Sequence, residues 1–397
     1  MASLGSLRLD NPESGIAQRL VKPPQACHEF NYRGATFRAA PETGFVICCF
    51  SGARSHTEAI SMGSELLQDG LDMWSIFGRA DLATRDAPDE YFAWWRDRGK
   101  SVIAVVDTGT FSFHVPPISI EVRDVRGQIV PPTPVTPQHH IGFRFYRLSQ
   151  VSDDLFDAFR NMYLAFELLL SAKYPKGVEH EIDWLRASLV ASIADLNLVS
   201  LAPAGADPVT HIIDKVYSNA RLPLFHAKGG RTYFAPVTSN RDRSEVHRAL
   251  QLLTLVVIRM AEAWYQARRL SGGVNLQLIT EADKRIFEKV SFVASSSSDF
   301  NLEGDLFQAA IERGVRFEGK FMDQFDNELR PHICGQVDLR TAKRVGVLKL
   351  LAVVDQQKPL LISRLAAHLD VNEFDVLEGV CFLRSINATE PRTLFPR

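Results

Sequence analysis

Residues 153–170 read DDLFDAFRNMYLAFELLL, and this stretch decides how the middle of the chain folds. Its apolar residues recur at spacings of three and four, namely Phe156, Phe159, Met162, Tyr163, Phe166, Leu169 and Leu170. An α-helix turns once every 3.6 residues, so this spacing places the apolar side chains on one face. The sequence therefore predicts an amphipathic helix that packs against neighbouring elements.

Three further segments carry the same helical period. Apolar stripes run through residues 182–196, 212–224 and 246–264. The pair Asp207-Pro208 is a helix start signal, because Asp caps the first turn and Pro tolerates its first position. Four amphipathic helices so close together predict an all-helical bundle, which we assign to residues 151–272.

The flanking parts have shorter apolar runs with a period of two. The run FVICCF at residues 45–50 predicts a buried strand, and Ser55 with Glu58 predicts a capping box for a helix that ends near Gly70. Further short strands are expected at 102–106, at Phe111, at Phe143 and Phe145, at 275–279 and at 290–293. The expected fold class is α+β multidomain, a central all-helical bundle flanked by N-terminal (1–150) and C-terminal (273–397) α+β parts. The N-terminal part is expected to be a sensor domain or a regulatory domain.

Composition narrows the class of protein. The 46% hydrophobic and 23% charged fractions are those of a soluble globular chain. With 45 basic and 47 acidic residues the net charge is -2, so any nucleic-acid site must be a local patch. The first twenty residues lack an apolar core and no run of ~20 apolar residues occurs, so a cytoplasmic protein with no membrane partner is expected.

Familiar chemical motifs are missing from the sequence. The patterns GxxxxGK[ST], GxGxxG, HExxH and GxSxG do not occur, which removes the main support for NTPase, dinucleotide-binding and common hydrolase functions. The five cysteines show no CxxC spacing, and His139-His140 has no acidic or Cys residues around it. We therefore expect no cofactor and no metal.

The stretch KVYSNARLPLFHAK, residues 215–228, carries the candidate chemistry in the pair Arg221 and His226. The spacing of an arginine and a histidine with four to six residues between them (R-x4-6-H) is not specific by itself, because Arg241 and His247 show it too. What distinguishes Arg221 is its position late on an amphipathic helix. RNA can be cleaved by its own 2′-hydroxyl if a group near neutral pKa moves the proton and a fixed cation holds the developing phosphate charge. Histidine and arginine meet these two needs without a metal.

This stretch, together with AFRNMYLAFELLLSAKYP (158–175) and DWLRASL (183–189), resembles the HEPN superfamily, the higher eukaryotes and prokaryotes nucleotide-binding domains, in its ApeA-like or MauJ-like bacterial groups. The resemblance covers residues 151–270 and implies a HEPN-like bundle. It further implies a metal-independent endoribonuclease that leaves 2′,3′-cyclic phosphate ends, as a phage-defence or toxin effector. Arg221 would stabilise phosphate charge and His226 would move the proton. The implied partners are RNA, a second subunit bound through the bundle, and a regulatory partner.

Four more residues are candidates for substrate binding: Asn219, Lys228, Glu167 and Arg231. Residues 219–270 hold nine basic and three acidic side chains, and such a basic flank suits phosphate binding. The alternative for this flank is the solvated end of a helix. The aromatic cluster YFAWW (91–95) is expected to be core, with base stacking as its alternative.

Geometry and departures from the family keep other functions open. Five residues along a regular helix rotate by ~500°, so Arg221 and His226 would point ~140° apart. Either Pro223 distorts the helix, or the long Arg221 side chain curls around it, or two subunits share each site. Leu222 stands where the family commonly has a polar residue. The alternatives are a non-catalytic dimerisation or nucleotide-binding protein of the HEPN fold and a helix-turn-helix DNA-binding regulator that uses residues 362–383.

Overall fold

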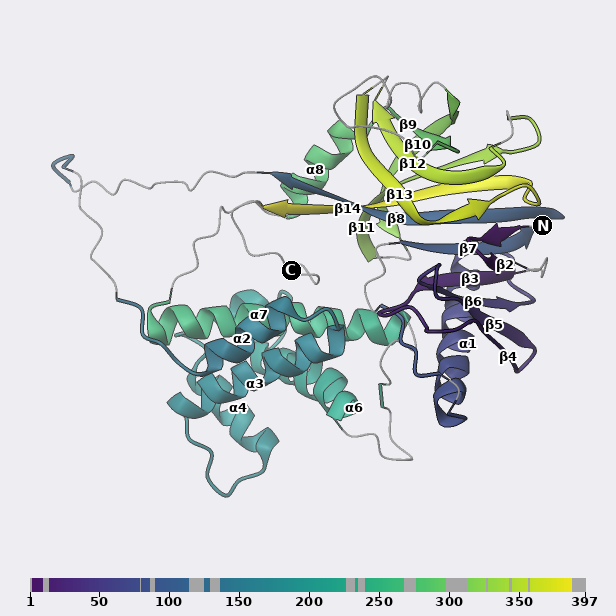
Figure 1. The fold of residues 1–397 in the computed structure, drawn as a ribbon. Coiled ribbons are helices and arrows are strands. Elements are labelled where there is room, and N and C mark those ends of the chain that lie inside the picture. The colour runs from purple at the N-terminus through teal and green to yellow at the C-terminus, as the bar shows by residue number, and fades with distance from the viewer. Residues whose placement is uncertain are drawn as a thin grey trace. The chain divides into compact units, whose positions relative to one another are not determined.

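The chain divides into two compact units, which are described separately (Figure 1). The first contains residues 1–113 and 274–386, and the second contains residues 114–273 and 387–397. The computed structural model describes residues 2–9, 14–78, 80–85, 90–113, 125–128, 136–225, 233–234, 240–267, 276–297, 313–325, 328–342, 345–355 and 358–387.

The first unit is built on a 14-stranded sheet to which both ends of the chain contribute. Its strand order is β2-β1-β13-β12-β9-β10-β11-β14-β8-β7-β3-β6-β5-β4. The N-terminal strands are β1 (Ser3–Leu4), β2 (Leu7–Arg8), β3 (Ser14–Arg19), β4 (His28–Tyr32), β5 (Ala35–Ala39), β6 (Phe45–Phe50), β7 (Glu90–Asp97) and β8 (Lys100–Phe113). The C-terminal strands are β9 (Val290–Ser295), β10 (Val315–Phe325), β11 (Glu328–Asp338), β12 (Val347–Asp355), β13 (Lys358–Asp370) and β14 (Val376–Asn387).

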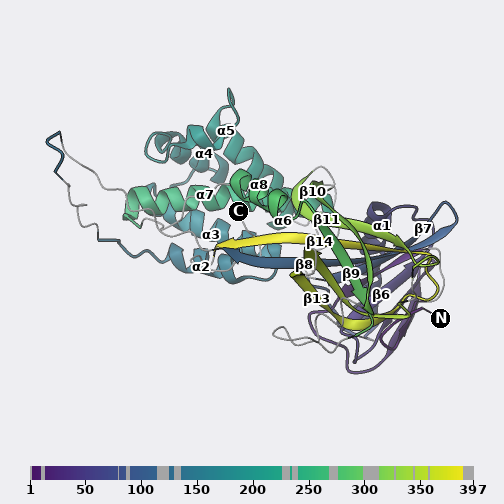
Figure 2. The same cartoon turned by 90° about the horizontal axis from the view of Figure 1, so that it is seen from above.

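This sheet shows that the predicted fold class is wrong. Strand β14 lies beside β8 and β1 pairs with β13, so the two ends of the chain form one sheet rather than separate α+β parts on either side of a central helical bundle (Figure 1 and Figure 2). The physical reason is that a period of two identifies a strand and its buried face without identifying its partner. Strands far apart in sequence can therefore pair as well as neighbours.

Strand β6 shows how the sheet is buried on both faces. Phe45, Ile47 and Cys49 point into one apolar core, while Val46, Cys48 and Phe50 point into the other. The second core is covered by helix α1 (His56–Ile76), which contributes Ala59, Leu67, Leu71 and Trp74. Burial on both sides explains why residues 45–50 form a continuous apolar run, and it confirms the predicted buried strand.

Helix α1 begins where the sequence predicts but continues beyond the expected end. Ser55 Oγ accepts a hydrogen bond from the backbone N–H of Glu58 at 3.2 Å, which confirms the N-cap. The helix runs past Gly70 to Ile76. A Cβ at Gly70 would lie 2.6 Å from Cε1 of Phe37, so this glycine serves the close approach of helix and sheet. It does not end the helix.

Two aromatic residues of β7 fill the cores. Trp94 is 2% exposed and Trp95 is 5% exposed, and as neighbours on a strand they point into opposite cores. The YFAWW cluster is therefore core, as the sequence indicates, and is not a surface for stacking bases.

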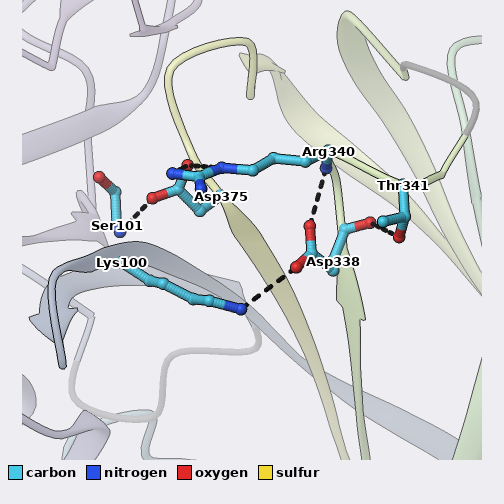
Figure 3. Close-up of polar contacts among 6 residues, drawn as sticks. All are labelled: Lys100, Ser101, Asp338, Arg340, Thr341 and Asp375. Carbon is cyan, nitrogen blue, oxygen red and sulfur yellow. Dashed lines mark hydrogen bonds and ion pairs between the residues drawn. The ribbon is translucent and has the colours of Figure 1, made fainter.

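A polar network fixes the β7–β8 turn to the C-terminal strands (Figure 3). Lys100 Nζ lies 3.2 Å from Asp338 Oδ2, and the backbone N–H of Ser101 donates to Asp375 Oδ2 at 2.9 Å. Asp375 Oδ1 also accepts from Arg340 Nε at 2.7 Å. Residues 100–101 are thus held by side chains that lie more than two hundred positions later in the chain.

The helix-turn-helix alternative is also wrong. Residues 362–370 lie in strand β13 and residues 376–383 in strand β14. Leu365, Ala367 and Leu369 are buried while the residues between them are exposed. The sequence interpretation relied on the spacing of four between Leu365 and Leu369. That spacing fits a helix, but it is also two periods of a strand.

The remaining strand predictions concern short segments, and two of them, residues 102–106 and Phe111, lie in β8, as predicted. Residues 290–293 lie in β9, as predicted. Phe143 and Phe145 instead lie in helix α2 (Gly142–Val151), and residues 276–279 open helix α8 (Leu276–Ile286). Such short runs carry too few periods to separate a strand from a helix, and flanking contacts decide.

The helices of the second unit are α2 (Gly142–Val151), α3 (Leu155–Lys173), α4 (Glu181–Ala191), α5 (Pro208–Ile212), α6 (Leu222–Phe225) and α7 (Asn240–Tyr265), with the short 3₁₀ helix η1 (Leu198–Leu201) and the π-helix η2 (Ile213–Arg221). Helix α3 confirms the helix predicted over residues 153–170, and Asp154 caps it by accepting from the backbone N–H of Asp157 at 2.7 Å. Asp207 caps α5 in the same way and Pro208 is in its first turn, as predicted.

The third predicted helix is not a regular α-helix. Its central segment, η2, is a π-helix of nine residues, and the N–H of Leu222 donates to the carbonyl of Tyr217, five positions earlier. Pro223 follows at once, and a proline has no N–H and crowds the carbonyl four residues before it. A wider turn before Pro223 relieves that crowding, and segments of this kind often occur at functional sites.

None of the helices within the described ranges combines the length and the apolar character needed to cross a lipid bilayer.

Candidate functional site

Arg221 ends the π-helix and forms an ion pair with Glu181. The distance from Arg221 Nη2 to Glu181 Oε2 is 3.0 Å. The side chain of Arg221 is 15% exposed and that of Glu181 is 24% exposed, so both are largely shielded from solvent. A pair in this position is less screened by water than a surface pair and is held more firmly.

Glu181 contacts Arg221, Tyr163 and Tyr217, and these four side chains form a cluster. Glu181 is the first residue of helix α4, where the unpaired N–H groups of the helix end favour a negative charge. The hydroxyl of Tyr163 on α3 donates to Glu181 Oε1 at 3.1 Å, and the hydroxyl of Tyr217 on η2 donates to Oε2 at 3.3 Å. One carboxylate therefore connects α3, α4 and η2 and fixes Arg221 between them.

Aromatic rings surround the guanidinium of Arg221. Its Cζ lies 5.7 Å from the ring centroid of Tyr163, 5.2 Å from that of Tyr217 and 5.4 Å from that of Phe225. Cations within about 6 Å of a ring are attracted to it. Tyr217 and Arg221 are four residues apart on η2, a spacing that places two side chains close to the same side of a helix.

The electrostatics of the cluster keep both tyrosines protonated. Burial raises the pKa of Tyr163, and the nearby charge of Glu181 raises it further. The pKa of Tyr217 is raised for the same two reasons. Both hydroxyls are therefore lasting hydrogen-bond donors to Glu181 at physiological pH.

Glu167 on α3 lies within electrostatic range of the pair. Burial raises the pKa of its carboxyl, the charge of Glu181 raises it further, and the charge of Arg221 opposes both effects. The structure thus brings one predicted residue, Glu167, into the surroundings of Arg221. Asn219, another predicted residue, lies on η2 with Arg221, and it is partly exposed.

Three other predicted site residues, His226, Lys228 and Arg231, lie outside the described residues. Sequence reasoning missed Glu181, Tyr163 and Tyr217 as site residues. Tyr163 appeared in the predicted apolar stripe of its helix, but nothing there indicated a hydrogen bond. Glu181 lies 40 positions before Arg221, and only the packing of α4 against η2 brings the two together.

Two arginines of the predicted basic flank are occupied by local contacts. Arg259 Nη1 donates to the carbonyl of Leu196 at 3.1 Å, and Arg248 Nη2 lies 2.9 Å from Glu245 Oε1. Arg259 thus binds the turn between α4 and η1, and Arg248 pairs with a neighbour on its own helix. In the part of the chain that the structure describes, no group of three or more His, Cys, Asp and Glu side chains is arranged to hold a metal ion.

Comparison with known proteins gives one match, over part of the second unit. Residues 143–262 match the model of the family described as methylamine utilization protein MauJ. This range contains Glu181 and Arg221 and covers less than a third of the 397 residues. No curated protein and no solved structure matches the chain. The similarity to the MauJ family therefore concerns the segment from α2 to α7.

Proposed function

We propose that the segment from α2 to α7 binds single-stranded RNA and cleaves it without a metal ion. Arg221 holds the phosphate and His226 moves the proton. The observation that carries the proposal is the position of Arg221, a partly exposed cation fixed by Glu181 and surrounded by aromatic rings. The resemblance of residues 215–228 to HEPN ribonucleases and the match to the MauJ family support it.

The fixed guanidinium suits phosphate chemistry for a physical reason. A cation that is already ordered need not lose side-chain freedom when the phosphate arrives, and it stabilises charge that develops in the transition state. The ion pair with Glu181 and the neighbouring aromatic rings provide this order. A planar guanidinium can also hold two non-bridging phosphate oxygens at once.

The substrate is single-stranded because of the aromatic ring beside the cation. Phe225 is 36% exposed, and its ring lies 5.4 Å from Arg221 Cζ. An exposed ring next to a cation can stack an unpaired base while the cation holds the adjoining phosphate. Bases in a duplex are already stacked and do not offer a face to Phe225.

The test measures cleavage of a labelled single-stranded RNA by the full chain in the presence of EDTA. Wild-type protein is expected to produce fragments with 2′,3′-cyclic phosphate ends. Arg221→Lys, which keeps the charge next to Glu181, and His226→Ala are expected to lose activity by about 100-fold or more. Arg186→Ala is the matched control, since Arg186 is an exposed arginine of α4. RNA that stays intact with wild-type protein, or equal cleavage by all four proteins, contradicts the proposal.

The same proteins test the expected setting of the activity. An RNase that acts as a toxin or in phage defence should slow growth when wild-type chain is overproduced, and His226→Ala should not. If two subunits share each site, mixing Arg221→Lys and His226→Ala proteins should restore part of the activity. Asn219, Lys228, Arg231 and Glu167 remain predicted substrate-binding residues, to be tested by RNA affinity.

A second candidate is RNA or nucleotide binding without catalysis. Pro223 is buried within the Arg221–His226 motif, and Arg221 itself is only 15% exposed, which also suits a cation whose role is to hold helices together. Binding of RNA by wild-type protein with no cleavage at any pH from 5 to 9 would favour this candidate.

A further inference from the structure

The first unit contains a cavity of about 360 Å³ that the proposed RNase chemistry does not use. One side is formed by residues 107–110 of β8 and by Cys381 of β14. The other is formed by residues 359–363 of β13 with Phe292 of β9 and Leu351 of β12. Cavities of 300–1,000 Å³ are typical of small-molecule sites, so this one suits a compact ligand.

The cavity wall is polar and apolar in about equal parts. Its apolar part includes Phe292, Leu351, Val353, Leu361 and Ile362. Gly109 allows β8 to pack closely against two residues of the wall: a Cβ at this position would lie 2.6 Å from Cδ1 of Leu361 and 3.1 Å from Sγ of Cys381. The ligand that fits such a wall has a hydrocarbon part.

The polar lining of the cavity, here called its polar end, consists of Asp107, Thr108, Thr110 and Ser363. Asp107 is the cross-strand partner of Glu90, so the two carboxyl groups lie on the same face of the β7–β8 pair. Glu90 is 4% exposed and accepts hydrogen bonds from the backbone N–H of Ala366 at 3.1 and 3.2 Å. Burial, with the charge of Asp107 adding to it, raises the pKa of Glu90 to about 7, although Arg19 opposes this effect.

We propose that this cavity binds a small organic ammonium ion, with the ammonium group at Asp107 and the hydrocarbon part against Phe292, Leu351 and Leu361. The carboxylate of Asp107 attracts a positive charge and repels an anion. Binding is non-covalent, because burial raises the pKa of the Cys381 thiol to about 12 and leaves almost no thiolate to react. The site lies in the first unit, and the proposal does not depend on RNA cleavage by the second.

The first test compares three ligands of one shape on the full chain. Benzylammonium, benzyl alcohol and benzoate have similar size and differ in charge. Titration calorimetry and thermal melting are expected to show binding in the order ammonium, alcohol, carboxylate, with at least about a tenfold step in Kd between the first two, which is 1.4 kcal/mol. Equal affinities, stronger binding of benzoate, or no binding of benzylammonium at about 10 mM would overturn the proposal.

Variants then locate the bound ion. Asp107→Asn removes the charge at the polar end and is expected to weaken benzylammonium binding about tenfold or more while sparing benzyl alcohol. Gly109→Val adds a side chain that must displace Leu361, a residue of the cavity wall, and should weaken both ligands. Asp72→Asn, which removes an exposed carboxylate of α1, is the matched control and should change neither. Unchanged binding to Asp107→Asn places the ammonium elsewhere. If a variant does not fold, the ligand series on the wild-type chain still decides.

Discussion

Replacing Glu90 with glutamine is expected to stabilise the first unit above pH 7 and to lower its stability by about 1 kcal/mol near pH 4. The folded protein raises the pKa of this carboxyl from its ordinary 4.5 to about 7, mainly through burial. Glu90 therefore binds its proton more tightly in the folded state than in the unfolded state. The stabilisation that this proton binding adds to the free energy of unfolding is fully present below pH 4.5 and is lost as the pH rises through 7.

The size of this effect follows from the two pKa values. Their difference of about 2.5 corresponds to roughly 3 kcal/mol, at 1.36 kcal/mol per pKa unit. Glutamine stays neutral at every pH, and its Oε1 can still accept from the backbone N–H of Ala366. Its amide N–H groups need an acceptor such as Asp107, and imperfect geometry offsets part of the gain by about 1 kcal/mol. A net gain of about 1–3 kcal/mol is expected at pH 8.

The assay is the free energy of unfolding in urea, followed by tryptophan fluorescence, at pH 5, 6, 7 and 8. Trp94 and Trp95 lie in the two cores next to this strand pair and report on the first unit. Wild-type stability should fall relative to Glu90→Gln across this range. Glu65→Gln, on the exposed side of α1, is the matched control. Parallel pH profiles for wild type and Glu90→Gln, or a constant loss at all four pH values, would refute the argument.

Three further substitutions test the packing, a helix cap and the candidate site. Gly70→Ala should destabilise the first unit by about 1–3 kcal/mol in urea unfolding, because the added Cβ meets the ring of Phe37; an unchanged midpoint would show that the ring can move aside. Ser55→Ala removes the cap of α1 and should cost about 1 kcal/mol in the same assay, unless water replaces the hydroxyl fully. Glu181→Ala leaves the cation of Arg221 without its carboxylate and should destabilise the second unit by about 1–3 kcal/mol, measured by helical circular dichroism; a stability equal to wild type would mean that the ion pair contributes nothing.

Local structure was predictable from the sequence where a pattern runs over many residues. The stripe in residues 153–170 gave the position of α3, and the run at 45–50 gave β6. The arrangement of the sheet was not predictable in the same way. The neighbours β8 and β14 lie more than 250 positions apart, and period-two patterns do not encode which strand pairs with which.

The residues of the candidate site also differ in whether the sequence could predict them. Arg221 was found because its residue type and neighbours suggest a chemistry. Glu181 was not, since a glutamate at the start of a helix is ordinary in sequence and gains its role only from tertiary packing. The π-helix around Arg221 was anticipated only as a distortion near Pro223, because the choice between a bend and a wider turn depends on contacts that the local sequence does not contain.

The sheet shared by both ends of the chain sets the order of events during synthesis. When β8 has left the ribosome, its neighbour β14 is still more than 250 codons from being translated. At ordinary elongation rates of about 5–20 residues per second, that delay lasts roughly tens of seconds. The edge of β8 stays available to other nascent chains throughout this time, whereas helices α2 to α7 form from local contacts while it waits. A chain interrupted after α7 would therefore keep its helices and expose half a sheet, which is the form that molecular chaperones should recognise.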